Sequence, residues 1–152
     1  MNLSNDLINS LMKEALIEAQ KAYDFLEVPI GSIIFDGEKI IGRGFNQVEK
    51  KQLATAHAEC IAIEEASRNL NNFRLTSCAI FSTIEPCTMC FGAILNSRIS
   101  NIFFGCSEPV SGALGSKSNL SSLYPEIKIY SGILEMECKD LIQRFFKMRR
   151  EK

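Results

Sequence analysis

The sequence predicts an α/β domain with three layers, in which helices cover both faces of a mixed five-stranded sheet that starts with an antiparallel hairpin. Asp36-Gly37 separates two short apolar runs, a pattern typical of a tight β-hairpin. Further along, apolar strand-like runs alternate with helix-like segments, which favours parallel strands joined by helical crossovers. The 152 residues contain no repeat or linker, so we expect one domain over residues 1–152.

The N-terminal half is predicted to form a helix, a hairpin and a loop. Apolar residues recur at helical spacing over residues 6–25, which indicates an amphipathic helix. Residues 30–35 form a short apolar run, and residues 39–45 return after the Asp36-Gly37 turn as its antiparallel partner. Residues 46–54 are polar and are predicted to be a loop.

The C-terminal part is predicted to alternate helices with buried strands. Residues 56–69 are rich in Ala, Glu and Ile, and Pro86 stands where a helix over residues 87–97 would begin. Residues 106–122, rich in Gly and Ser, form a long loop of the kind that is often functional. The remaining elements are strands over residues 78–84, 99–105 and 126–130 and a final helix over residues 135–150.

Composition sets broad limits on function. Hydrophobic residues make up 46% and charged residues 23%, as in soluble globular domains. The net charge of -1 does not indicate a nucleic-acid binder, so any RNA contact needs a local basic patch. We expect a cytoplasmic protein without a membrane span, because no signal peptide or long apolar run is present. In that compartment its six cysteines would be reduced.

His57, Cys87 and Cys90 are the candidate metal ligands. Zinc favours imidazole nitrogen and thiolate sulfur, and a C-x-x-C pair at a helix start can place two sulfurs on one ion. Three protein ligands leave one position for water, which is the catalytic pattern. We therefore predict one Zn2+ per subunit. A redox-active C-x-x-C pair and a closed structural site with Cys60 as fourth ligand are the alternatives.

Glu59 is the candidate proton carrier. His57 is the only histidine, so none is left as a general base once the metal binds it. Glu59 lies two residues further, in the first turn of the predicted helix, where both side chains can reach the helix end. A solvated helix residue is the alternative interpretation of Glu59.

The chain resembles the cytidine deaminase superfamily, in which H-x-E is followed by P-C-x-x-C. More closely, it is similar to the bacterial tRNA-specific adenosine deaminases. The similarity starts near Val28 and covers nearly all of the following chain. It comprises residues 28–31, 44–46, 55–59, 85–90, 96–99, 104–105, 112–113, 115–116 and 145–150. The zinc motifs specify the superfamily, whereas the G-A-x-G-S loop and the F-F-x-M-R-R tail specify the tRNA branch.

The resemblance implies hydrolytic deamination of adenosine to inosine at the wobble position of a tRNA, expected to be an arginine tRNA. Zinc-activated hydroxide would attack C6 of the base, and Glu59 would move the protons. Asn46 would contact the base or its ribose, although it could instead cap a turn. The other implied pocket residues, several of which could equally be core, are Val28, Pro29, Ala58, Ile84, Glu85 and Pro86.

The resemblance also implies an anticodon stem-loop as partner, and a homodimer. The predicted RNA contacts are Arg74, Arg98, Glu108, Phe145, Phe146, Lys147, Arg149 and Arg150. The alternative is an amphipathic last helix with Phe145 in the core and a solvated charged end, which includes Lys152. The helix over residues 87–97 could form the dimer contact or belong to the core.

Two departures from the family pattern stand out. Residues 107–110 read Ser-Glu-Pro-Val, where the family usually has an Arg-Asp pair and a lysine, and Ile84 replaces a more common leucine.

Two rival functions remain open. One is a free-base or nucleoside deaminase of guanine or cytosine type, and the other is a non-catalytic zinc or RNA-binding module.

Overall fold

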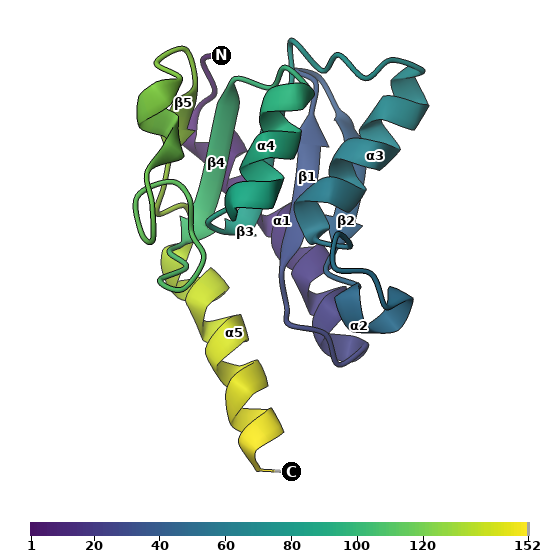
Figure 1. The fold of residues 1–152 in the computed structure, drawn as a ribbon, viewed down its shortest axis with the longest axis vertical. Coiled ribbons are helices and arrows are strands. Elements are labelled where there is room, and N and C mark those ends of the chain that lie inside the picture. Colours follow the sequence, from purple (N-terminus) through teal and green to yellow (C-terminus); the bar gives the residue numbers. More distant parts are fainter. Residues whose placement is uncertain (152) are drawn as a thin grey trace.

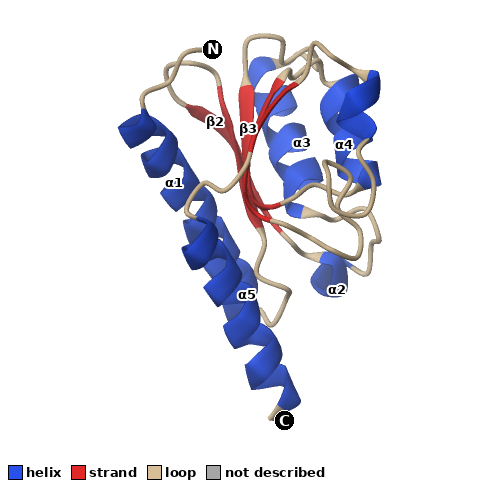
Figure 2. Ribbon diagram, turned by 90° about the vertical axis from the view of Figure 1, so that its left-hand side faces the viewer, coloured by secondary structure: helices blue, strands red, loops and turns tan. Residues whose placement is uncertain are grey.

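The structure is a computed structural model that describes residues 1–151, and it consists of a five-stranded sheet between two layers of helices (Figures 1 and 2). This arrangement confirms the predicted fold class. The strands are β1 (Gly31–Phe35), β2 (Ile40–Phe45), β3 (Ala79–Ile84), β4 (Asn101–Cys106) and β5 (Lys128–Tyr130). The helices are α1 (Asn5–Asp24), α2 (Val48–Lys51), α3 (Ala58–Leu70), α4 (Thr88–Asn96) and α5 (Glu135–Arg150), with a 3-10 turn η1 (Leu120–Leu123).

The sheet order is β2-β1-β3-β4-β5, and β1 is the one strand that runs against its neighbours. The predicted hairpin is present, since Asp36 Oδ1 accepts the backbone N–H groups of Glu38 and Lys39, each at 2.8 Å. β3, β4 and β5 are parallel, as predicted. β3 and β4 are buried throughout, but Lys128 and Tyr130 of β5 are exposed because β5 is an edge strand.

Alternation along the strands builds two hydrophobic cores, one on each face of the sheet. Ile80 and Ile102 point to the face covered by α3 and α4. Phe81 and Phe103 point to the face covered by α1 and α5 (Figure 2), where their rings stack with centroids 4.4 Å apart. Because side chains alternate along a strand, each buried strand supplies both cores.

The one helix that the sequence did not predict is α2, inside the segment 46–54. Its four residues show no apolar periodicity, and none of them is buried. A distant residue holds it in place: the buried carboxylate of Glu27 accepts the N–H of Glu49 at 3.0 Å and that of Lys50 at 2.6 Å. α2 therefore depends on a tertiary contact.

Glycines in β2 bring α3 onto the sheet. A Cβ atom at Gly44 would lie 2.3 Å from the Ala58 carbonyl oxygen and 2.6 Å from the Ala62 nitrogen. Gly42 makes an equally close approach to the Ala62 carbonyl oxygen, at 2.3 Å. The first turn of α3 is therefore placed by backbone-to-backbone contact, which allows little displacement.

α5 extends past the lower edge of the sheet (Figures 1 and 2). Cys138, Leu141 and Phe145 form its buried stripe, whereas its last turn carries exposed cations. Lys152, which belongs to the predicted charged end, lies outside the described residues. Within residues 1–151, no helix has both the length and the hydropathy that crossing a membrane requires.

We expect Gly44→Ala to lower the free energy of unfolding by roughly 1–3 kcal/mol, because the added methyl group must displace the first turn of α3. Urea unfolding followed by circular dichroism measures this. Gly92→Ala is the matched control, since no heavy atom lies within 4 Å of its Cβ position. In a helix that change should stabilise by about 0.5–1 kcal/mol. Equal midpoints for both variants would contradict the close approach.

Candidate active site

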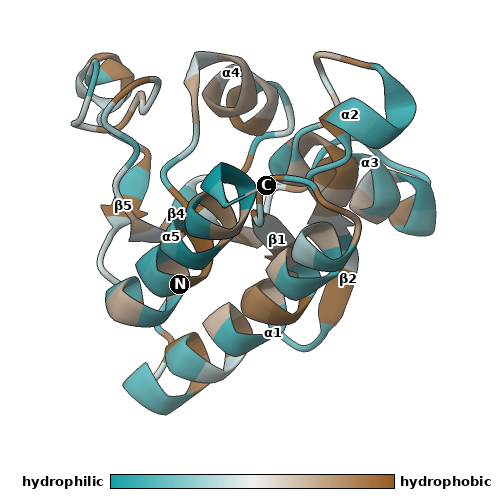
Figure 3. Ribbon diagram, turned by 90° about the horizontal axis from the view of Figure 1, so that it is seen from below, coloured by the Kyte–Doolittle hydropathy of each residue, from teal (hydrophilic) through white to brown (hydrophobic). Residues whose placement is uncertain are grey.

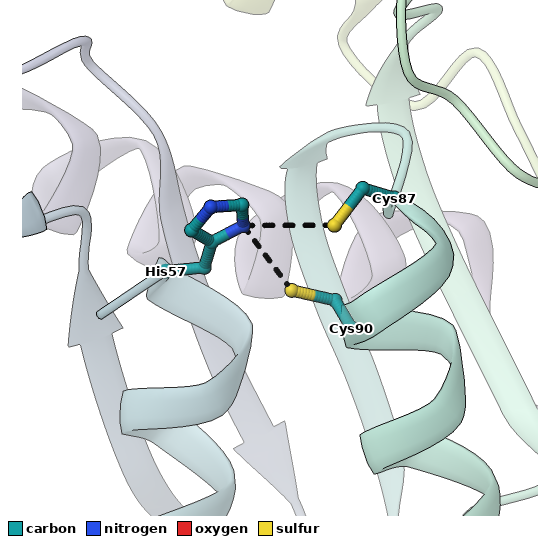
Figure 4. A group of neighbouring side chains, drawn as sticks. All are labelled: His57, Cys87 and Cys90. Atoms are coloured by element: carbon teal, nitrogen blue, oxygen red, sulfur yellow. Dashed lines mark hydrogen bonds between the residues drawn. The ribbon is translucent and has the colours of Figure 1, made fainter. Parts of the chain in front are cut away.

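The predicted metal ligands lie where the N-terminal ends of α3 and α4 meet (Figure 4). His57 is the N-cap residue of α3, Cys87 is that of α4, and Cys90 lies one turn into α4. Both helices direct the positive ends of their dipoles toward this point, which favours thiolates. The hydrogen bond from the Cys90 thiol, with a further contribution from His57, lowers the pKa of Cys87 to about 4.

The spacing of the three ligand atoms suits zinc. His57 Nδ1 lies 3.6 Å from Cys87 Sγ and 3.5 Å from Cys90 Sγ, and the three atoms lie within 4.8 Å of one another. With Zn–N distances of about 2.05 Å and Zn–S distances of about 2.3 Å, a tetrahedron separates nitrogen from sulfur by about 3.6 Å. The donor set is therefore already arranged around the position of an ion.

Cys60 lies beside this set without joining it. Its Sγ is 3.9 Å from Cys90 Sγ. Among residues 1–151, however, the ligand atoms that all lie within 4.8 Å of one another belong to His57, Cys87 and Cys90. The geometry therefore favours a group of three protein ligands over the closed alternative that uses Cys60.

Glu59 lies in the first turn of α3 and is 3% exposed, so it is not a solvated helix residue. It follows His57 by two residues and lines the same cavity as His57 and Cys87. Burial raises the pKa of Glu59 to about 7. A carboxyl group with this pKa can both accept and release a proton at neutral pH.

His57, Cys87 and Glu59 form part of the wall of a cavity of about 1070 Å3. Nine other residues predicted from the sequence also line it. They are Val28, Asn46, Ala58, Ile84, Glu85, Glu108, Phe145, Phe146 and Arg149. The lining also includes residues that the sequence did not indicate, namely Phe25, Leu26, Glu27, Ile30, Val48, Glu49, Lys50 and Ser111.

Seven predicted residues are not part of this lining, and one of them is the buried ligand Cys90. Pro29 and Pro86 are buried next to it, and Lys147 and Arg150 are exposed on α5. Arg74 and Arg98 lie farther away, because they follow the C-terminal ends of α3 and α4, whose N-terminal ends carry the ligands. The Arg74 guanidinium stacks on Phe73, 4.4 Å from the ring centroid.

Asn46 caps a turn and also borders the cavity. Its Nδ2 donates to the Val28 carbonyl oxygen at 3.2 Å, and its Oδ1 accepts the Val48 N–H at 3.3 Å. The structural role considered for Asn46 is therefore present. Its amide also ties the segment before β1 to the start of α2, both of which line the cavity.

Glu85 has a role that its sequence motif did not reveal. Its buried carboxylate accepts the N–H groups of Glu108 at 3.1 Å, Leu114 at 2.9 Å and Ser116 at 3.2 Å, and also the Ser116 hydroxyl. Burial alone would raise the pKa of Glu85, but these hydrogen bonds outweigh it and the pKa is lowered. One carboxylate thus organises most of the predicted loop 106–122.

The loop needs Gly112 to reach Glu85. A Cβ atom at Gly112 would lie 2.4 Å from Glu85 Cδ, and the same glycine forms a bridge with Cys87. Two further links join the loop to the segment that carries the predicted ligand Cys87. One is the hydrogen bond from the Ala113 N–H to the Pro86 carbonyl oxygen at 3.0 Å, and the other is the set of hydrogen bonds that Glu85 accepts. The wall formed by Glu108 and Ser111 is therefore fixed relative to the metal site.

We expect Glu85→Gln to lower the free energy of unfolding by about 1–3 kcal/mol, because an amide N–H2 would face backbone donors and leave them unpaired. Amide hydrogen exchange should accelerate within residues 107–119. Ser116→Ala should cost less, since the three N–H donors to Glu85 remain. Unchanged exchange in the Glu85→Gln variant would contradict the proposed anchoring of the loop.

Comparison with known proteins agrees with this site. The family model for the cytidine and deoxycytidylate deaminase zinc-binding region matches residues 6–106. The tRNA-specific adenosine deaminase of Haemophilus influenzae is 40% identical over 145 residues, covering 93% of this chain and 84% of that protein. The chloroplastic tRNA(adenine(34)) deaminase of Arabidopsis thaliana is 39% identical over 91% of this chain, which spans 12% of that longer protein.

A solved structure agrees with the fold as well. It comes from a study of A-to-I editing by tRNA:A34 deaminases at the wobble position of transfer RNA. It is 34% identical, covers 87% of this chain and 98% of its own, and has a TM-score of 0.81. The chain therefore belongs to the zinc-dependent cytidine and deoxycytidylate deaminase family, in which relatives at about 40% identity are tRNA-specific adenosine deaminases.

Proposed function

We propose that the protein hydrolyses adenosine to inosine at the wobble position of a tRNA anticodon, with an arginine tRNA as the expected substrate. The observation that carries the proposal is the buried carboxyl group of Glu59, which lines a large cavity together with His57 and Cys87 of the three-residue metal-binding group. The names of the relatives support tRNA as the substrate class.

His57, Cys87 and Cys90 would hold the zinc ion. When bound, zinc supplies a Lewis acid that lowers the pKa of a water molecule and makes it a nucleophile near neutral pH. The sequence contains no second histidine, so proton transfer falls to the nearby carboxyl group.

Glu59 would carry the two protons of the attacking water in turn. Its carboxylate accepts the first proton from the water and passes it to N1 of adenine, which makes C6 more electrophilic. After the C6–O bond has formed, the proton left on that oxygen moves through the same carboxyl group to the exocyclic amino group, the C6–N bond breaks and ammonia leaves. Water and adenosine are consumed, and inosine and ammonia are produced. The pKa of about 7 suits a group that must both accept and donate.

The cavity walls would hold a base that has left its stack. Val28 and Ile84 provide apolar surface, while Asn46 and the first turn of α3 at Ala58 provide polar groups. An anticodon loop is a suitable source of such a base, because its nucleotides are single-stranded and splayed.

The end of α5 would contact the RNA, with different roles for its two phenylalanines. Phe145 is 3% exposed and packs edge-to-face on Tyr23, so it anchors the helix. Phe146 is 44% exposed and lines the cavity together with Arg149. We assign base stacking to Phe146 and phosphate contacts to Arg149, with Lys147 and Arg150 beside them.

We also propose that the protein acts in the cytoplasm as a homodimer. Phe91 and Ile94 of α4 belong to the core, whereas Met89 is 36% exposed and Leu95 is half-buried. The exposed Met89 and the accessible part of Leu95, which also packs against the core, are the candidate dimer contact. The six free cysteines suit a reducing compartment such as the cytoplasm.

Glu59→Gln should retain zinc but lose turnover by several orders of magnitude, because glutamine cannot carry the proton. The assay follows inosine formation in an anticodon stem-loop with adenosine at the wobble position, and zinc is determined by atomic emission. Glu64→Gln, an exposed change in the same helix, is the control. Near-normal turnover by Glu59→Gln would rule out the assignment.

An ammonia-release assay separates the candidate substrates. Wild-type protein is given the stem-loop, adenosine, guanine, guanosine and cytidine, and ammonia release is compared. We expect release from the stem-loop. Release from the free bases or nucleosides alone would instead identify a small-molecule deaminase.

Arg149→Ala should weaken stem-loop binding by roughly tenfold and reduce its dependence on salt, because one phosphate contact is lost. Arg144→Ala is the matched control, since Arg144 on the same helix is paired with Asp140 at 2.8 Å and does not line the cavity. Fluorescence anisotropy over a series of salt concentrations measures both effects. Binding that does not respond to salt would contradict an electrostatic contact by α5.

A further inference from the structure

The cavity continues beyond the reacting groups toward a surface that the proposed chemistry does not use. Phe25, directly after α1, is 55% exposed and lines this part together with Lys50 of α2. The ends of these two helices lie side by side (Figure 1), tied by the hydrogen bonds of Glu27 to the N–H groups of Glu49 and Lys50.

Two neighbouring side chains, Phe45 and Lys50, contact the Phe25 ring. It stacks against Phe45, at the end of β2, with ring centroids 5.9 Å apart and an angle of 8° between the planes. Lys50 Nζ lies 4.2 Å from the Phe25 ring centroid. We name Phe25, Phe45 and Lys50 the Phe25 platform. Because its rings are already packed, a ligand that stacks on it loses little side-chain entropy in the protein.

An exposed aromatic ring with an adjacent ammonium group matches the chemistry of single-stranded nucleic acid. Bases stack on aromatic side chains whatever their identity, and nearby cations contact the backbone phosphates. Figure 3 shows the molecule from below, where α2 and the last turn of α5 are largely hydrophilic. The residues that face the cavity from these elements include Lys50 and Arg149.

The size of the cavity indicates more than one nucleotide. Its volume of about 1070 Å3 is at the upper limit of pockets that enclose a whole drug-sized ligand. A single nucleoside beside Glu59 would leave the part near Phe25 to another group. In an RNA loop, the group that necessarily accompanies the target is its neighbouring nucleotide.

We propose that the Phe25 platform binds the base of a nucleotide adjacent to the deaminated adenosine. The base stacks on Phe25 in the position over the ring where Lys50 Nζ lies in the free protein, and Lys50 Nζ moves aside to pair with a phosphate of the same strand. This inference rests on the proposed function, and it adds a recognition site on α1 and α2 that is separate from the contacts of α5.

The test is equilibrium binding of a fluorescent anticodon stem-loop to zinc-loaded protein, with Glu59→Gln in every variant to prevent turnover. Phe25→Ala should weaken binding on the order of tenfold. The measurement is repeated with stem-loops that lack the base on the 5′ side or on the 3′ side of the target. On one of these two, the Phe25→Ala change should have no further effect, because the stacking partner is already missing.

Matched variants separate stacking from folding and charge. Phe25→Leu retains apolar contact with Phe45, so it should keep the melting temperature and still lose affinity. Lys50→Ala should reduce the salt dependence of binding by about one unit of slope, whereas Lys51→Ala, on the same helix but not in the cavity lining, should not.

Two results would contradict base stacking on the Phe25 platform. One is an unchanged affinity of the Phe25→Ala variant for the intact stem-loop. The other is a loss of affinity in Phe25→Ala that is equal for the intact stem-loop and for both abasic stem-loops. The proposed function has its own outcome. If wild-type protein forms no inosine in the intact stem-loop, that function fails. If it does form inosine and Phe25→Ala binds normally, the platform alone fails.

Discussion

The meeting of two helix N-termini is the constraint on which the rest of the structure depends. α3 begins after His57 and α4 begins after Cys87, so two ligands occupy N-cap positions and Cys90 and Glu59 lie in the first turns. The sheet sets this meeting point, because β2, with Gly44, holds the start of α3 and β3 leads directly into α4. The site therefore needs no flexible segment to bring nitrogen, sulfur and carboxyl oxygen together.

Two buried carboxylates fix opposite walls of the cavity in the same way. Glu85 accepts backbone N–H groups from the loop that carries Glu108, and Glu27 accepts those of α2, which carries Lys50. In both cases a charged acceptor in a buried place meets several donors, which makes its removal costly. These two carboxylates therefore shape the cavity, while Glu59, the proposed proton carrier, has a pKa of about 7.

Local signals were sufficient for most of the fold and for the ligands. Asp36-Gly37 marked the hairpin, and the helix predicted over residues 135–150 has those bounds in the structure. The features that the sequence did not reveal depend on contacts between residues that are distant in sequence. α2 is held by Glu27, and the donors to Glu85 lie 23 to 31 residues further along, mostly on the backbone. Adjacent phenylalanines also differ, since helical rotation buries Phe145 and exposes Phe146.

The most direct test of the central claim is X-ray absorption spectroscopy at the zinc edge of the purified protein. The arrangement predicts one nitrogen at about 2.0–2.1 Å, two sulfurs at about 2.3 Å and one oxygen from solvent. The spectrum of a Cys60→Ser variant should be the same, since Cys60 stands outside the ligand set. A shell with three sulfurs that becomes two in Cys60→Ser would show that the protein closes the site, and the account of catalysis would then be wrong.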